Sequence, residues 1–204
     1  MKFPPGVAKH IAAGDVLSFG VHYTATGQVE RDRPRLGLWF AKSPARRQAL
    51  TITISDRKFV DGKELPRDKR GQTIYPKIPA FARDWSIQAE TTLDREITIH
   101  AVWPHMHLRG KDMTILLRYP SGKEVTLVSV PEYDPNWQVT YELARPLSVP
   151  AGSTLRAVAH YDNSAGNRRN PAPDQDVAWG WQTWEEMFHP YVEVSLPRGQ
   201  ETVR

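Results

Sequence analysis

The sequence of 204 residues contains no cysteine, only four methionines and no long apolar run. The absence of cysteine excludes disulfide bonds, thiolate metal ligands and thiol nucleophiles, and leaves histidine, methionine and carboxylates as possible metal ligands. No apolar run approaches the roughly 18 residues that a membrane-spanning helix requires. Residues 1–6 lack the apolar core of a secretory signal. We therefore expect no membrane span, and we interpret the chain as a piece of a longer protein.

The charge of the chain is +4, and its basic residues are scattered along the sequence. Nucleic-acid-binding domains usually concentrate basic side chains in a stripe with interleaved aromatic residues. Because this sequence has no such stripe, we expect no nucleic-acid partner.

Helical periodicity is scarce, whereas β-branched and aromatic residues alternate with polar ones between Gly and Pro. This pattern predicts an all-β fold, an antiparallel β-sandwich of jelly-roll type. The predicted strands cover residues 15–24, 35–41, 49–55, 88–103, 112–119, 123–130, 138–143, 154–162 and 191–196. Two long irregular segments, 61–84 and 163–176, interrupt them, and loops of this length often carry function.

The most informative segment is HMHLRGKDM, residues 105–113, which follows an apolar strand-like run. Side chains two residues apart on a strand point the same way, so His105 and His107 can bind one metal ion. Like the preceding apolar residues of this run, both histidines occupy odd-numbered positions. They therefore continue the row of inward-facing side chains unless Pro104 introduces a bulge. Buried, hydrogen-bonded histidines are the alternative interpretation.

Met187 is the candidate third ligand. Met106 alternates away from the histidine pair, Met113 begins an apolar run, and Met1 is terminal. A thioether beside two imidazoles favours copper, because soft sulfur stabilises Cu(I). A gap-filling core methionine is the alternative interpretation.

Three motifs together resemble the C-terminal domain of the copper type II, ascorbate-dependent monooxygenases, the family of peptidylglycine α-hydroxylating monooxygenase and dopamine β-monooxygenase, in a bacterial branch. They are HMHLRGKDM (105–113), AHYDNS (159–164) and WGWQTWEEM (179–187). A fourth segment, DVLSFGVHY (15–23), resembles the end of the family's N-terminal copper domain.

This resemblance implies that His105, His107 and Met187 bind the catalytic copper, and that His22 is one of three histidines binding a second copper. The other two histidines have no match in this chain. It also implies an N-terminal copper domain and crossover segment ending in residues 1–84, and a catalytic copper domain in residues 85–204. The implied activity is dioxygen-dependent C–H hydroxylation, with ascorbate or another electron donor and a small-molecule or peptide-like substrate. The family implies an extracytoplasmic location, and other domains of a longer parent chain are possible partners.

The remaining histidines and carboxylates carry weaker signals. His160 is either near the copper or facing substrate, or it is a hydrogen-bonded core residue. His189 is close in sequence to Met187, but we do not expect it to be a ligand. Glu185 and Glu186 are poor acid-base candidates because neighbouring residues face different ways, and Glu186 has the spacing of a helix capping box with Thr183.

Two other functions stay open. A cupin-like metalloenzyme also uses two histidines two residues apart, followed by a carboxylate, and Asp112 and His160 are then further ligands. The cupin carboxylate is normally Glu, however, and His160 follows Gly152 too late. The chain is alternatively a non-catalytic copper-binding or structural β-sandwich module. Mutation of Met187 separates the cupin-like interpretation from the copper one, because only the latter needs the thioether.

Overall fold

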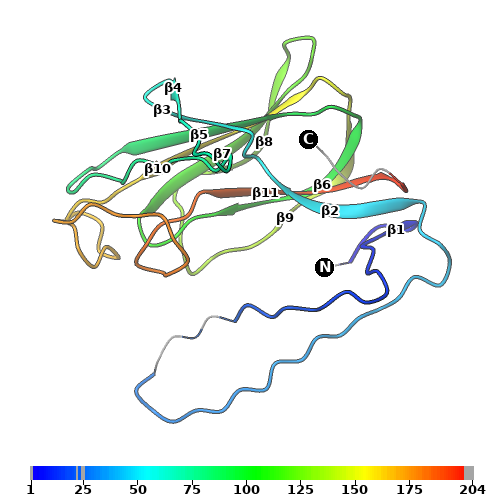
Figure 1. Ribbon diagram of the computed structural model, residues 1–204, viewed down its shortest axis with the longest axis horizontal. Helices are drawn as coiled ribbons and strands as arrows, with labels where there is room; N and C mark the ends of the chain where they lie inside the picture. The colour runs from blue at the N-terminus through cyan, green and yellow to red at the C-terminus, as the bar shows by residue number, and fades with distance from the viewer. Residues whose placement is uncertain (1, 22, 24–25, 200–204) are drawn as a thin grey trace.

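The computed structural model describes residues 2–21, 23 and 26–199, and these form two packed β-sheets (Figure 1). The five-stranded sheet has the order β1-β2-β11-β6-β9, and the six-stranded sheet has the order β4-β3-β5-β10-β7-β8. β1 runs parallel to β2, and the other strand pairs are antiparallel. The strands are β1 (Val7–Ala8), β2 (Arg47–Thr53), β3 (Arg57–Val60), β4 (Lys63–Glu64), β5 (Trp85–Thr92), β6 (Ile97–His105), β7 (Gly110–Arg118), β8 (Glu124–Val130), β9 (Tyr141–Val149), β10 (Thr154–Tyr161) and β11 (His189–Pro197). The predicted all-β sandwich is confirmed.

The core lies between the two sheets and follows from the alternation of side chains along the strands. In β10, Leu155, Ala157, Ala159 and Tyr161 are fully buried, while the residues between them are partly exposed. Period-two alternation of this kind buries one face of each sheet against the other. The described residues include no helix that is long and apolar enough to cross a membrane.

The region predicted as one strand, 88–103, is two strands. β5 ends at Thr92, and β6 begins at Ile97 after a turn in which Leu93 exchanges backbone hydrogen bonds with Gly152 and Ser153. β5 pairs with β10 in the six-stranded sheet, whereas β6 pairs with β11 and β9 in the other. The chain therefore crosses between the sheets just before the segment that carries the histidine pair.

The two long irregular segments contact one another at one end of the sandwich. Ile78 and Val177 form an isolated β-bridge, and the Phe81 N–H donates to the Pro173 carbonyl. The Asn163 N–H donates to the Ala82 carbonyl. Two loops distant in sequence thus form one loop layer beside the ends of β6 and β10.

The strands predicted at 15–24 and 35–41 are absent from the described residues. The connection from β1 to β2 instead forms a long open loop that projects away from both sheets (Figure 1). It carries exposed apolar side chains such as Val29 and Trp39. An alternating sequence forms a strand only when another strand satisfies its backbone hydrogen bonds, and here the described residues of this loop have no strand partner.

Candidate metal centre

Along β6, the side chains that face the core change from odd-numbered to even-numbered positions before the histidine pair. Ile97 and Ile99 are fully buried, but after a register shift between Ile99 and Ala101 the fully buried residues are Val102 and Met106. The bulge lies at position 100 and not at Pro104. One extra residue reverses the alternation of a strand. His105 therefore lies on the outer face of the five-stranded sheet and does not continue the core stripe.

Three imidazoles gather on this outer face. The ring centroids of His105 and His107 lie 5.2 Å apart, with the ring planes at 87°. His189 is the cross-strand partner of His105 on β11, and their centroids are 6.2 Å apart. Burial, followed by the charges of His107 and Lys58, lowers the pKa of His189, so its neutral form is favoured. The structure thus brings beside the pair a third histidine that the sequence analysis did not expect to be a ligand.

The hydrogen bonds of the pair fix which nitrogen of each ring can bind a metal. His107 Nδ1 donates to the backbone carbonyl of Glu185 at 3.0 Å, since a carbonyl can only accept. His105 Nδ1 lies 2.5 Å from Gln138 Oε1, and Gln138 Nε2 in turn donates to the Pro135 carbonyl, which orients the amide. Both rings then carry the lone pair on Nε2. Metal-binding histidines are normally oriented in this way by a second hydrogen bond.

Glu186 connects the segment of the histidine pair to the segment of Met187. Its carboxylate accepts the backbone N–H groups of His107 at 2.9 Å and of Arg109 at 2.6 Å, and its Oε2 lies 3.4 Å from the Met187 nitrogen. The predicted helix cap at Glu186 is wrong, because no helix follows Thr183: Glu186 forms an isolated β-bridge with Trp179, and its carboxylate contacts a distant segment. Burial raises the pKa of Glu186 to about 7, and the backbone donors oppose this shift.

Met187 directly follows Glu186, whose carboxylate contacts the backbone nitrogens of both His107 and Met187. Its side chain is 8% exposed, and its carbonyl accepts a hydrogen bond from the Tyr161 hydroxyl. The described residues include no group of three or more His, Asp or Glu side chains that could hold a metal ion. A thioether is a ligand of another type, and one that suits copper.

The remaining predicted site residues lie elsewhere. His160 is on β10, where its neighbours Ala159 and Tyr161 face the core, so its ring is on the outer face of the six-stranded sheet. There it hydrogen-bonds Asp112 at 2.6 Å. The structure does not bring these two side chains to the histidine pair, which contradicts the cupin-like ligand set. His22 lies outside the described residues.

Sequence reasoning missed the side chains that support this segment from behind. The Tyr133 hydroxyl accepts the Met106 N–H at 3.0 Å and donates to the Met106 carbonyl at 2.7 Å. A Cβ on Gly110 would lie 2.8 Å from both Met106 Cβ and Tyr133 Cδ1, so only glycine fits there. The sequence carries no signal for Tyr133 or Gln138, because both act through contacts across about 30 residues.

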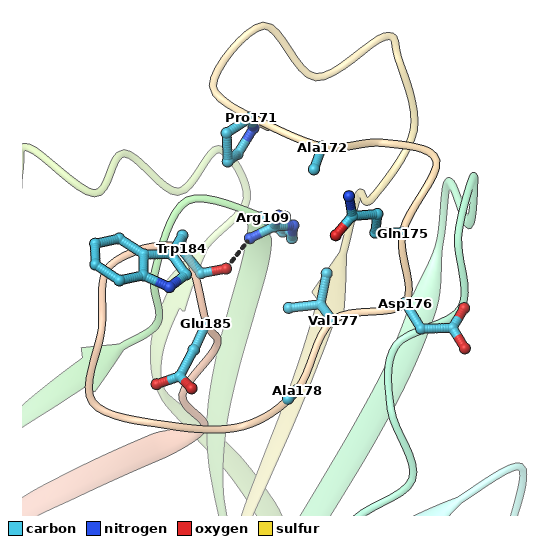
Figure 2. Close-up of a pocket in the computed structure, with 9 residues that line it drawn as sticks. All are labelled: Arg109, Pro171, Ala172, Gln175, Asp176, Val177, Ala178, Trp184 and Glu185. Carbon is cyan, nitrogen blue, oxygen red and sulfur yellow. Dashed lines mark hydrogen bonds between the residues drawn. The ribbon is translucent and has the colours of Figure 1, made fainter.

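Arg109 supports the site from the loop layer and lines a cavity of about 260 Å³ (Figure 2). It is 2% exposed. Its Nε donates to Asn163 Oδ1 at 2.9 Å, and its Nη1 donates to the Trp184 carbonyl at 2.8 Å. Arg109, in the motif HMHLRGKDM, thereby contacts the motifs AHYDNS and WGWQTWEEM.

Comparison with known proteins identifies the family of this chain. Residues 72–193 match the family described as copper type II ascorbate-dependent monooxygenase, C-terminal domain. No curated protein matches. Among solved structures, this chain is similar to one described as the structure of infectious bursal disease virus Gt strain (12% identity, 83% of this chain and 38% of that one, TM-score 0.31). It is also similar to a ruminal GH26 endo-beta-1,4-mannanase (16% identity, 55% of this chain and 24% of that one, TM-score 0.25). The family match covers more than half of the sequence, and the chain therefore belongs to the copper type II ascorbate-dependent monooxygenase family, through its C-terminal domain.

Proposed function

We propose that this chain binds copper through His105, His107 and Met187. When bound, copper supplies the activation of dioxygen for hydroxylation of a C–H bond, with electrons from ascorbate or a similar donor. The observation that supports this proposal is that Nδ1 of each ring has a hydrogen-bond partner, Gln138 Oε1 for His105 and the Glu185 carbonyl for His107, so that Nε2 would be the nitrogen of each ring that binds the metal. The donor set of two imidazoles and a thioether also suits both oxidation states of copper.

The chain's other residues hold this arrangement in place. Gln138 and the Glu185 carbonyl orient the two rings, and Glu186 fixes the backbone of His107 next to that of Met187. Positions held by packed side chains and hydrogen bonds keep ligands in the geometry that a metal requires. His105 is partly exposed on the outer face of the five-stranded sheet, whereas His107 and Met187 are buried.

Several features of the proposal come from the family resemblance. His22 stays a predicted ligand of a second, electron-supplying copper, and full turnover depends on that site. The division into residues 1–84 and 85–204 stays a prediction, as do the bacterial origin and the extracytoplasmic location. The substrate is a small molecule or a peptide-like molecule, and no nucleic acid takes part.

X-ray absorption spectroscopy of the copper-loaded protein tests the ligand set. We expect the Cu(I) form to show nitrogen ligands and one sulfur ligand, and the sulfur signal to disappear in Met187→Leu. Met113→Leu is the matched control, because Met113 is fully buried in the core and its replacement should leave the signal intact. A sulfur signal that persists in Met187→Leu, or is absent from the wild type, would contradict the proposal.

Oxygen consumption tests the enzymatic part separately. A chain joined to its upstream domain should consume oxygen with ascorbate and copper in a substrate-dependent way, and His107→Ala should abolish this. If copper binds with the expected ligands but no substrate-dependent consumption occurs, the protein is a non-catalytic copper-binding module.

A further inference from the structure

Four aromatic rings form a contact cluster beside the segment of Met187. They are Tyr75, Trp85, Tyr161 and Trp179. Trp179 is the centre of this cluster, because its ring centroid lies 5.1 Å from that of Tyr75 and 5.8 Å from that of Trp85. The centroids of Trp179 and Tyr161 are 5.6 Å apart. Tyr161 is fully buried, whereas the other three rings are partly exposed. The cluster therefore connects the protein interior to the surface through direct ring contacts.

The cluster meets the segment of Met187 at two points. The Tyr161 hydroxyl donates a hydrogen bond of 2.7 Å to the Met187 carbonyl. Trp179 forms an isolated β-bridge with Glu186, the residue before Met187. One hydrogen bond and one ring contact thus lead from the backbone of the proposed thioether ligand to Trp179, a partly exposed indole.

Trp179 is the ring of the cluster best suited to losing an electron. Indole and phenol rings lose single electrons more readily than most side chains, but an oxidised phenol also has to release its proton. The Tyr161 hydroxyl faces a backbone carbonyl, which accepts a hydrogen bond but is a very weak base. An oxidised indole can keep its proton, and Trp179 Nε1 donates to the Pro76 carbonyl at 2.7 Å. The partial negative charge of that oxygen stabilises a positive charge on the Trp179 ring.

Two neighbouring rings are less suited to this role. Lys58 Nζ lies 5.5 Å from the centroid of the Tyr75 ring, and its positive charge opposes the removal of an electron from that ring. Trp103 lies close to the histidine pair, with its ring centroid 5.9 Å from that of His105. Its Nε1 is buried and makes no hydrogen bond within the described part of the chain. No acceptor therefore stabilises a positive charge on the Trp103 indole.

A copper site that activates dioxygen needs protection when no substrate is present to be oxidised. The thioether of the proposed ligand Met187 is the kind of group that oxidants convert to a sulfoxide, and a protein around such a site has to limit competing reactions. We infer that Trp179 is a protective electron donor, which reduces oxidising equivalents at the copper through Tyr161. The inference rests on the proposed function, because it requires copper at His105, His107 and Met187.

The protective cycle transfers one electron at a time. Trp179 gives one electron, through Tyr161 and the Met187 segment, to an oxidising equivalent of the kind that hydrogen peroxide generates at copper. That equivalent is reduced by one electron, and the indole becomes a cation radical that keeps its Nε1 proton on the Pro76 carbonyl. An external one-electron reductant such as ascorbate then restores the indole and becomes its own one-electron-oxidised form. No bond of the protein forms or breaks in the cycle.

Electron paramagnetic resonance of the copper-loaded chain, frozen shortly after addition of hydrogen peroxide without substrate, tests this inference. We expect an organic radical signal that changes shape when the protein contains ring-deuterated tryptophan, and that does not change with ring-deuterated tyrosine. The signal should be lost in Trp179→Phe and weakened in Tyr161→Phe, which keeps the ring but removes the hydrogen bond to Met187. Trp181→Phe is the matched control, because Trp181 belongs to the same motif and is 73% exposed, and it should keep the signal. Far-ultraviolet circular dichroism checks that each variant is folded.

Peptide mapping by mass spectrometry gives a second measurement that needs no spectroscopy of the copper. In the wild type, oxidation products should appear at Trp179 before Met187 sulfoxide accumulates. In Trp179→Phe, Met187 sulfoxide should form faster than in the wild type and in Trp181→Phe. Equal rates in the three proteins would overturn the inference.

The remaining outcomes also decide the question. A radical carried by tyrosine, or one that disappears in Trp103→Phe and persists in Trp179→Phe, would overturn the assignment to Trp179. A signal unchanged in Tyr161→Phe would overturn the path through Tyr161. Copper bound with the expected nitrogen and sulfur ligands but no tryptophan radical contradicts this inference alone. The absence of a sulfur ligand in the wild type contradicts the proposed function, and this inference with it.

Discussion

Replacement of Tyr133 by Phe should measure how firmly the histidine segment is held. The change removes one hydroxyl that is hydrogen-bonded to both the N–H and the carbonyl of Met106, at 3.0 and 2.7 Å. Met106 is fully buried and Tyr133 is 5% exposed, so water cannot replace these bonds. An unsatisfied buried polar group costs about 1–3 kcal/mol. With two such groups, we expect the free energy of unfolding to fall by about 3 kcal/mol.

Urea unfolding followed by circular dichroism measures this free energy by linear extrapolation. Tyr119→Phe is the matched control, because Tyr119 is partly buried and its hydroxyl makes no hydrogen bond with the described residues. The control should change stability by less than about 0.5 kcal/mol. Because Met106 lies between the two proposed ligands, copper affinity measured by equilibrium dialysis should also fall in Tyr133→Phe. Equal stabilities of the two variants would refute the reasoning.

Three other substitutions test neighbouring features. Burial raises the pKa of Glu186 to about 7 from an ordinary value of 4.5, so the folded, metal-free protein binds this proton more tightly than the unfolded chain. The free energy of unfolding should therefore decrease by about 3 kcal/mol as the pH rises from about 4.5 to 7. Urea titrations across this range should show a smaller decrease for Glu186→Gln, and parallel curves would contradict the assignment. Gly110→Ala should destabilise by about 1–3 kcal/mol through the contacts of its Cβ with Met106 and Tyr133, and an unchanged denaturation midpoint would show that the segment can shift. Asn163→Ala removes hydrogen bonds to both loops and to Arg109, so limited proteolysis should cleave the loop layer faster than in the wild type.

The fold class was predictable because strand alternation is a local property. The alternation in 154–162 predicted β10 to within one residue. The sequence of 88–103 did not reveal the turn between β5 and β6, because Leu93, Asp94, Arg95 and Glu96 include no Gly or Pro. Apolar and polar residues do alternate in 15–24 and 35–41, but among the described residues no neighbouring strand pairs with these segments. The alternation alone therefore predicted strands that do not form.

The candidate ligands were predictable from motifs, whereas their supporting contacts were not. His105 and His107 stand out by spacing and by family resemblance. The role of Glu186 depends on backbone groups almost 80 positions earlier in the chain, and local sequence offered a helix cap as a simpler explanation.

The irregularity in β6 at position 100 has a consequence for protein engineering. Anyone who transplants the histidine segment onto another scaffold would have to transplant this residue as well. Deletion of the residue at position 100 would reverse the side-chain alternation in the rest of the strand. His105 would then point into the hydrophobic core and Met106 into the solvent. Insertion and deletion scanning along this strand should accordingly find positions on either side of the irregularity that differ sharply in tolerance.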